Sequence, residues 1–517
     1  MIAVSEAWKT THTEKLLPET FIEIGYSVSE PGLQQDSSAS ANYEEAFSEA
    51  ETLVDTLSKT SEKYATLEWN SFGLDGSFEY FDGTPEDPGY VATPICDENG
   101  VFMDIPMITI SFSKVHTNLI PGITITWSET YEEWASKFRV TSYRDGVATK
   151  QYTVEDNTSI VAPVSMDLQD FDAITIEILE WSHPYHRTRA IDVFAGIKSI
   201  YTKNDLLNFS HTQTVDLLSA SLPVNKITFG LRNEDSRWNP DNPTGVEKYL
   251  LEQQEITVRY GMIVNGSTEW IDGGRFWLSE WNTPANGLEA SFTAKDALEF
   301  MHEVYTGTRS GTLYEIAEAA FVQANMPVMA DGSNRYVIDS VLNDYSTDFS
   351  DKDDDYTVAE VIQMIAHMGG CVLHQDRSGV IYLRPRQIVL RDYQINQNVS
   401  YSHPEFDISK PLKAVVVNYG DNQKATVSVG TAGEVQTVDN PFIKTKADAE
   451  RVGRATQTIL EGRKTISGEF RADPRMDALD IVEVQSKYAT NIVTITDITY
   501  STTGGAMRGK FTGRVDV

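Results

Sequence analysis

Four side chains that could hold a metal ion or act as a nucleophile fall within ten residues of the sequence: His367, Cys371, His374 and Asp376. Histidine, cysteine and carboxylate groups are the usual zinc ligands, and a zinc site needs about four of them converging at roughly 2.0–2.3 Å. Whether these four can converge depends on the elements that carry them.

The segment TVAEVIQMIAHMGG, beginning at Thr357, predicts a helix. Thr357 and Glu360 have the spacing of a capping box, and Gly369-Gly370 provides a stop. At 100° per residue, His367 lies opposite Val358 on the helix, so we expect His367 to face solvent.

The next run, CVLHQD, turns at RSG and returns as VIYLRP, which predicts a β-hairpin. Strand alternation places Cys371 and Leu373 on one face and Val372 and His374 on the other. Because these side chains diverge, the pattern favours a buried structural cysteine over a metal or nucleophilic site.

Two segments resemble a calcium-binding loop and a phosphate-binding loop, but each lacks residues that the motif requires. DKDDD, from Asp351, has Tyr356 where a calcium loop needs glycine and Ile362 where it needs glutamate. GGAMRGK, from Gly504, has Phe511 in place of the serine or threonine of a phosphate-binding loop, so we predict a hairpin turn there.

No motif indicates catalysis. His302-Glu303 begins a zinc-protease motif, but Thr306 stands where its second histidine belongs. The G-x-S-x-G sequence of a nucleophile elbow does not occur. A pair of catalytic carboxylates has no visible signature among 76 acidic residues. We therefore predict a protein that is not an enzyme and that has no metal or cofactor.

Composition limits the class of protein. A chain of 517 residues should divide into about three or four domains. Its net charge of -34 disfavours nucleic acid or acidic lipid as a partner. Only two cysteines occur, and MIAVSEAWKTTHTEK shows no secretory signal, so we expect synthesis in a reducing cytoplasm. The longest apolar runs, such as AVVVNY, are too short to cross a bilayer.

The alternation of apolar and polar residues divides the chain into regions that are mainly β. MITISFS, GITITWS, KFRVTSY and DAITIEILEW predict a β-sandwich, with a tight hairpin at Asp145-Gly146. An apolar helical pattern before it predicts an inserted helix or arm. A second β-rich region ends in an expected helix, AKDALEFMHEVY, and is followed by an α+β stretch. The last region pairs strands with one helix, ADAERVGRATQTILEG.

The sandwich contains one loop with residues suited to sugar contact. WSHPYHRTR gathers Trp181, His183, Tyr185 and Arg187, together with His186. Aromatic faces beside planar donors suit sugar rings, which present CH patches and hydroxyl groups together. The alternative is a loop packed against the sandwich edge or a neighbouring chain.

From Asn225 onward, an ordered set of segments resembles the hub proteins of bacteriophage tails. These segments are FGLRNEDSRWNPDNPTG, EITVRYGM, EWIDGGRFWLSEW, SFTAKDALEFM, YTVAEVIQMIAHMGGCVLHQDRSGVIYLRP and FRADPRMDALDIVEVQS. With the first strand near Thr20 they cover somewhat over half of the chain. The region between, including ITISFSKVHTNLIPGITITWSETYEEWASKFRVTSYRDG, resembles a galactose-binding-like jelly roll.

The resemblance implies a mainly β fold with α+β parts: two hub β-barrels, an α+β middle domain and an inserted jelly-roll sandwich. The expected division is a first strand of barrel I at 1–28, a helical insertion or arm at 29–66, the sandwich at 67–203, the rest of barrel I at 204–305, the α+β domain at 306–386, and barrel II with one helix at 387–517.

The family also implies a structural virion protein, a homotrimer around the channel of a tail tip or baseplate. Its expected partners are distal tail or tube proteins, the tape-measure protein and fibre or tip proteins, and it would be assembled in the host bacterial cytoplasm without stable membrane insertion. DNA would pass without specific binding, because an acidic wall repels phosphates.

Two other functions fit parts of the sequence. One is a carbohydrate-binding adhesin for host recognition that works through Trp181, His183, Tyr185 and Arg187. The other is a tail-associated cell-wall hydrolase, as some hub proteins carry a C-terminal lytic domain. Because the chain ends at Val517, soon after the last barrel, the sequence does not favour this second alternative.

Overall fold

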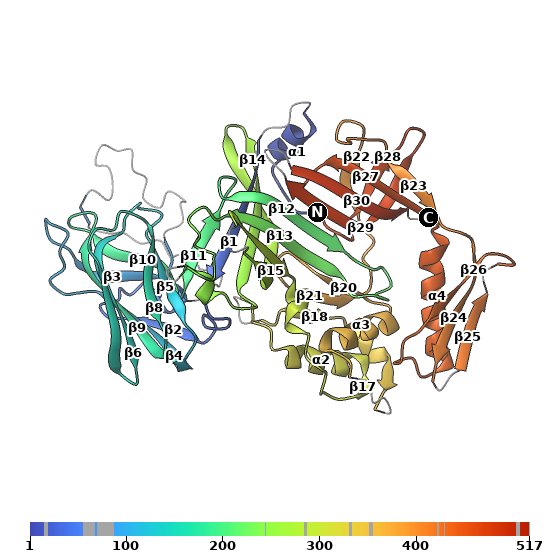
Figure 1. The fold of residues 1–517 in the computed structure, drawn as a ribbon, viewed down its shortest axis with the longest axis horizontal. Coiled ribbons are helices and arrows are strands. Elements are labelled where there is room, and N and C mark those ends of the chain that lie inside the picture. The colour runs from blue at the N-terminus through green and yellow to red at the C-terminus, as the bar shows by residue number, and fades with distance from the viewer. Residues whose placement is uncertain are drawn as a thin grey trace.

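The computed structural model describes residues 1–14, 19–54, 68–69, 87–242, 245–283, 287–329, 333–350, 355–420, 423–428, 430–502 and 507–515. These residues form an elongated, mainly β molecule with a sandwich at one end and small α/β units at the other (Figure 1). The predicted fold class is confirmed. No helix among these residues is both long and apolar enough to cross a membrane.

The central feature is one sheet of 13 strands that runs through both predicted barrels. We call its first part barrel I: β1 (Thr20–Val28), β11 (Ile197–Tyr201), β12 (Leu206–Thr214), β13 (Val224–Arg232), β14 (Glu255–Val264), β15 (Ser267–Asn282) and β16 (Glu289–Lys295). We call the second part barrel II: β22 (Leu390–Ile395), β23 (Glu405–Ile408), β27 (Lys464–Arg471), β28 (Ile481–Gln485), β29 (Thr490–Thr502) and β30 (Met507–Val515).

Antiparallel pairing of β12 with β29, from Phe209↔Thr502 to Thr214↔Asp497, joins the two barrels. Their inward side chains form one apolar core, which includes Tyr26, Phe292 and Phe511. The two barrels therefore share both a hydrogen-bond ladder and a core.

The sandwich lies between two neighbouring strands of barrel I, since β1 ends at Val28 and β11 begins at Ile197. One of its sheets has the order β2-β4-β9-β6-β7 and the other β3-β10-β5-β8. Their bounds are β2 Ser37–Ala41, β3 Tyr90–Ile95, β4 Met107–His116, β5 Ile120–Trp127, β6 Ala135–Arg144, β7 Val147–Val154, β8 Val161–Leu168, β9 Phe171–Trp181 and β10 Arg187–Phe194. The predicted turn between β6 and β7 has positive φ at both Asp145 and Gly146.

The helical arm expected over 29–66 is wrong for its described part, residues 29–54. These residues contribute strand β2, which pairs with β4, and only one 3-10 turn, η1 (Ala50–Leu53). Leu33, Leu53 and Val54 are buried in the sandwich core. Packing against the sandwich outweighs the helical spacing of this segment. Residues 55–66 lie outside the described part of the chain.

The middle region holds helices α2 (Leu313–Ala324) and α3 (Val358–Gly369), which pack against each other. Its strands are β17 (Ser310–Thr312), β18 (Tyr336–Ile338), β19 (Ser346–Asp348), β20 (Val372–Gln375) and β21 (Ile381–Arg384). The expected helix at 294–305 is reduced to a 3-10 turn, η3 (Ala297–Phe300); further 3-10 turns are η2 (Glu247–Tyr249) and η4 (Ser340–Asp344).

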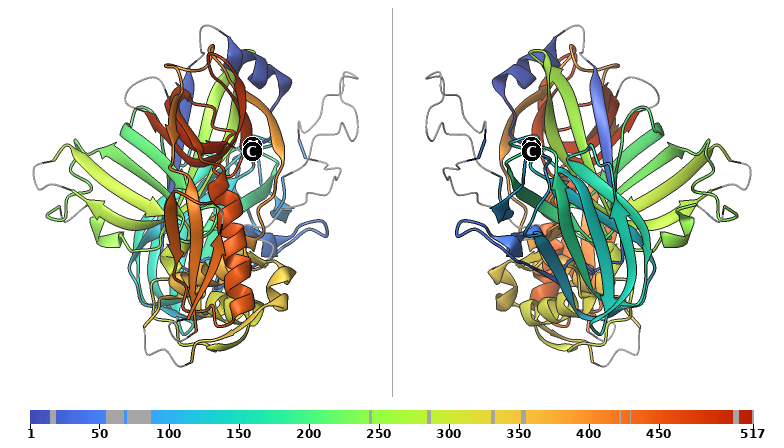
Figure 2. Two further views of the ribbon diagram at one scale, coloured as in Figure 1. Left: turned by 90° about the vertical axis from the view of Figure 1, so that its right-hand side faces the viewer. Right: turned by 90° about the vertical axis from the view of Figure 1, so that its left-hand side faces the viewer.

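An α/β unit is inserted into barrel II. Helix α4 (Lys446–Glu461) lies along a three-stranded sheet of β24 (Leu412–Tyr419), β25 (Gln423–Ser428) and β26 (Glu434–Val438), as Figure 2 shows. The helix matches the predicted segment ADAERVGRATQTILEG within one residue at each end. Val452 and Gly453 on its buried face contact the sheet.

A short N-terminal helix, α1 (Glu6–Thr13), bridges the two barrels. Trp8 is buried against Met262 and Ile271 of barrel I. On the other side, His12 Nε2 lies 3.0 Å from the Ala472 carbonyl oxygen of barrel II. The helix therefore adds a second link across the junction that the β12–β29 ladder already joins.

Candidate functional sites at the sandwich tip and the barrel junction

The capping box at Thr357 is present, with the Glu360 amide donating to Thr357 Oγ1 at 3.3 Å, and Gly370 ends the helix with φ +68°. The predicted hairpin forms as β20 and β21. Burial raises the pKa of the Cys371 thiol to about 12 and lowers the pKa of His374 to about 4. Within the described residues, no three His, Cys, Asp or Glu side chains are grouped to hold a metal ion.

The expectation that His367 faces solvent is wrong, because its side chain is buried. The loop after β12 covers this face of α3, and Gln363 of the same face donates a hydrogen bond to the Ser219 carbonyl oxygen. Burial lowers the pKa of His367, which favours the neutral imidazole. Helical periodicity cannot reveal a segment that folds back from more than a hundred residues away.

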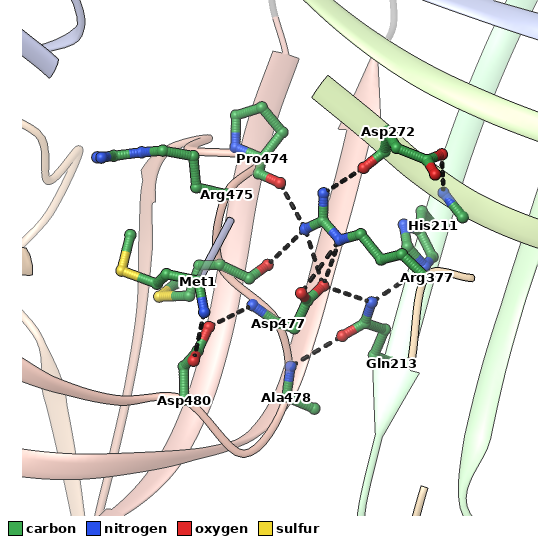
Figure 3. A network of polar contacts seen from close by, with 12 residues as sticks. Met1, His211, Gln213, Asp272, Arg377, Pro474, Arg475, Asp477, Ala478 and Asp480 are labelled. Atoms are coloured by element: carbon green, nitrogen blue, oxygen red, sulfur yellow. Dashed lines mark hydrogen bonds and ion pairs between the residues drawn. The ribbon is translucent and has the colours of Figure 1, made fainter. Parts of the chain in front are cut away.

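The residue of this stretch with the most polar contacts is one that the sequence did not single out, Arg377, in the turn between β20 and β21 (Figure 3). Its guanidinium donates to both carboxylate oxygens of Asp477, with Nε at 3.0 and 3.1 Å. It also donates to the Asp272 carbonyl oxygen at 2.6 Å and to the Pro474 carbonyl oxygen at 2.5 Å. One side chain thus ties the middle region to both barrels.

The charge on Arg377 is stabilised at this junction. Burial opposes the charge, but the Asp477 carboxylate outweighs burial and raises the pKa of the guanidinium. Burial likewise acts against the Asp477 charge, and Arg377 outweighs it, so the pKa of the carboxyl is lowered. Gln213 of β12 donates to the same carboxylate at 3.0 Å. The Arg377 guanidinium and the Asp477 carboxylate therefore neutralise each other.

At the sandwich tip, two of the four candidate sugar-contact residues are not available. Trp181 is only 2% exposed, and its indole NH donates to Glu133 Oε2 at 2.6 Å. Arg187 donates to Glu45 Oε1 at 2.5 Å and to the Thr93 carbonyl oxygen at 2.5 Å. Trp181 is therefore not placed for the proposed sugar contact, because the residue ends β9 with its ring in the core.

The other two candidates, His183 and Tyr185, are exposed and meet two tryptophans that sequence reasoning missed. The Tyr185 ring lies 6.1 Å from that of Trp69, which is 61% exposed. The His183 ring lies 6.5 Å from that of Trp134. We call these four residues the tip cluster. No sequence signal joins them, because they come from three separate segments.

A buried pair holds the tip cluster in place. His186 Nδ1 lies 2.6 Å from Glu133 Oε1, and its Nε2 is hydrogen-bonded to the Trp69 carbonyl oxygen. Burial disfavours the imidazolium, but Glu133 outweighs burial and the pKa of His186 is raised. Glu133 Oε2 accepts a hydrogen bond from the Trp181 indole NH. The same carboxylate therefore positions both the Trp181 ring in the core and the His186 ring in the loop.

Comparison with solved structures shows similarity to tail proteins. The 43 kDa tail protein of prophage MuSo2 from Shewanella oneidensis aligns with a TM-score of 0.43 and 12% identity, over 61% of this chain and 95% of that chain. A tail protein from Neisseria meningitidis MC58 aligns with a TM-score of 0.40 and 10% identity, over 62% and 94%.

A carbohydrate-binding module of family 32 from C. perfringens NanJ, solved in complex with galactose, aligns with a TM-score of 0.21 and 15% identity. This alignment covers 34% of the present chain and 99% of the module. Neither a protein-family model nor a curated protein matches the sequence.

Proposed function

We propose that this protein is a structural virion component, the hub of a phage tail tip or baseplate, and that it acts by assembly rather than by catalysis. The observation that supports this most is the joining of two barrels into one 13-stranded sheet. Arg377 locks that sheet to the middle region, and the ordered hub-like segments lie in these same elements.

In this proposal three copies surround a channel. Tail-tube and tape-measure proteins contact one side, and fibre or tip proteins contact the other. The 76 acidic against 42 basic residues suit a wall along which DNA slides without binding, because paired phosphates and cations would hold it. The site of action is the virion, after assembly in the host bacterial cytoplasm.

The proposal is tested by the mass of the purified full-length protein in native mass spectrometry, followed by averaged electron micrographs. The expected result is three copies of 57.7 kDa in a ring with a central opening. A monomer at all concentrations would contradict the hub. Release of soluble fragments from purified peptidoglycan would instead indicate a cell-wall hydrolase.

A second function, contact with a host glycan through the sandwich, is favoured by the tip cluster. Exposed Trp69 and Tyr185 offer two aromatic faces, and His183 offers a hydrogen-bonding edge beside them. Binding to a sugar ring at this position would bury apolar surface that the isolated chain leaves in water.

The variant Trp69→Ala with Tyr185→Ala tests this second function, since both side chains are exposed and their loss should leave folding intact. We expect phage carrying the variant to assemble normally and to adsorb to host cells far less. Tyr152→Ala with Tyr488→Ala, also exposed, serves as the matched control. If phage with the tip variant adsorbed as well as wild-type phage, the proposed role of the sandwich in host recognition would be wrong.

A further inference from the structure

The sandwich carries an exposed apolar loop with an acidic rim. Ile95, Val101, Met103 and Ile105 are 44%, 41%, 97% and 39% exposed. Three acidic side chains in the same loop are exposed as well: Asp97, Glu98 and Asp104. No lysine or arginine occurs from residue 87 to residue 113. We call these seven residues the loop patch.

The loop patch is held in one conformation. Asp97 Oδ1 accepts hydrogen bonds from the amides of Asn99 at 2.8 Å and Val101 at 2.9 Å. The Trp181 amide donates to the Gly100 carbonyl oxygen at 2.8 Å, and the Phe102 side chain is buried beneath the loop. Exposed apolar side chains on a fixed backbone lose little further freedom on binding, which favours a docking surface.

Barrel II carries a surface of opposite charge. Arg508, Lys510 and Arg514 alternate along the outer face of β30, while Phe511 points into the core. No aspartate or glutamate occurs from residue 498 to residue 515, although the chain as a whole has a net charge of -34. Strand β6 has as many basic residues, but there Lys137 and Arg139 form ion pairs with Glu155 and Glu177.

Beside this strand lies an exposed aromatic ring. Tyr401 is 52% exposed, and the Arg508 guanidinium lies over its ring at 5.5 Å from the centroid. In the register with β27, Arg508 is next to Arg471 and Lys510 is next to Glu469. We call Tyr401, Arg508 and Lys510 the β30 face; it combines two exposed cations with an apolar ring.

The two surfaces are complementary in charge and in apolar character. Methionine packs well against aromatic rings, and an acidic rim around apolar side chains matches cations around a tyrosine. The loop patch and the β30 face cannot meet within one chain, because barrel I lies between the sandwich and barrel II (Figure 1). A contact between the two surfaces is therefore a contact between separate molecules.

We propose that the loop patch of one copy docks onto the β30 face of the next. This inference rests on the proposed assembly of several copies and names the surfaces that join them. The contact is heterologous, since different surfaces of the two copies meet, and repeating it by a closing rotation generates a ring. Three repeats give the ring that the proposed hub requires.

Charge reversal with rescue tests the contact in the full-length chain. Glu98→Lys with Asp104→Lys reverses the rim while leaving the Asp97 turn intact. Arg508→Glu with Lys510→Glu reverses the β30 face. We expect each pair to weaken association about a hundredfold, because like charges then meet, and the combination of all four to restore the trimer in native mass spectrometry.

Two further variants sharpen the result. Met103→Ser removes the apolar centre of the loop patch without adding a charge and should also weaken the trimer, without lowering the melting temperature of the sandwich. Glu318→Lys with Asp344→Lys makes the same charge change at exposed positions of the middle region and should leave the trimer intact.

If both charge-reversed double variants still formed the trimer as strongly as the wild type, the proposed contact would be wrong, while the hub assembly itself would remain supported. Dissociation by each pair without rescue by the combination would also overturn the proposed contact, since the two surfaces would then not be partners. A wild-type protein that is monomeric at all concentrations would instead remove the assembly itself.

Discussion

Replacing Arg377 with methionine should loosen the joint between the middle region and both barrels. Methionine keeps most of the side-chain volume but removes the guanidinium, and with it the hydrogen bonds to Asp477, to the Asp272 carbonyl oxygen and to the Pro474 carbonyl oxygen. Asp477 is then left with a charge beside an apolar side chain, with Gln213 as its remaining side-chain donor.

The size of the effect follows from burial. Removing one partner of a buried ion pair costs about 3–5 kcal/mol; the Arg377 side chain is 8% exposed, but the Asp477 side chain that keeps its charge is 26% exposed, so the lower end of that range, about 3 kcal/mol, applies. For a cooperative unit of roughly 150–250 residues, each kcal/mol lowers the melting temperature by about 2–4 °C. Arg377→Met should therefore melt roughly 10 °C below the wild type at pH 7.

Differential scanning calorimetry measures this shift, and Arg391→Met provides the matched control. Arg391 pairs with Asp480 at 2.8 Å, but the Arg391 side chain is 41% exposed, and the buried Asp480 carboxylate keeps the Met1 ammonium at 2.6 Å, so the loss of Arg391 should cost about 1 kcal/mol or less after solvent screening. If the two variants melted within about 2 °C of each other, the junction would not depend on the buried pair.

The pH dependence of the same variant gives a second check. Because Arg377 holds the pKa of Asp477 below its usual range, the pair contributes fully above about pH 4, where the unfolded carboxyl is also ionised. Its contribution is lost as the pH falls through the lowered pKa of the folded state. The difference between wild type and Arg377→Met should therefore be full at pH 7 and shrink under more acidic conditions.

Three further outcomes are expected. Burial raises the pKa of Asp296 to about 7, so this carboxyl destabilises the folded state increasingly as the pH rises from the unfolded pKa of about 3.9 to about 7; Asp296→Asn should raise the melting temperature most at pH 8, less at pH 5 and little at about pH 3, as calorimetry over a pH series would show. Gly122 has φ +141°, and a Cβ there would lie 1.9 Å from the Val164 carbonyl oxygen; Gly122→Ala should destabilise the sandwich by roughly 3 kcal/mol, measured by urea unfolding. Cys371 is buried with its pKa raised to about 12, so a thiol reagent should label it only after denaturation, and rapid labelling of the native protein would contradict this.

Local signals in the sequence predicted local structure well. The Asp145-Gly146 turn and the capping box at Thr357 depend on neighbouring residues only, and both form as expected. Helix α4 also follows its apolar periodicity. The hub-like segments predicted the mainly β class because each contains a strand or helix whose pattern does not depend on distant contacts.

The errors arise where distant segments meet. Strand β2 has small side chains and acquires its conformation from β4 and the sandwich core. The burial of His367 depends on a loop around Ser219, and the burial of Trp181 depends on Glu133. The tip cluster could not be predicted for the same reason, since Trp69 and Tyr185 meet only after folding.

The place at which the sandwich enters and leaves barrel I has a consequence for how such proteins diversify. Val28 and Ile197 stand opposite each other in the ladder between β1 and β11. The whole sandwich therefore occupies the place of a hairpin loop between β1 and β11, and a two-residue turn could connect the same two strands. One recombination event that deletes or exchanges the whole module therefore leaves the ladders of both barrels intact, while any contact that the loop patch makes with a neighbouring copy is lost or replaced with it.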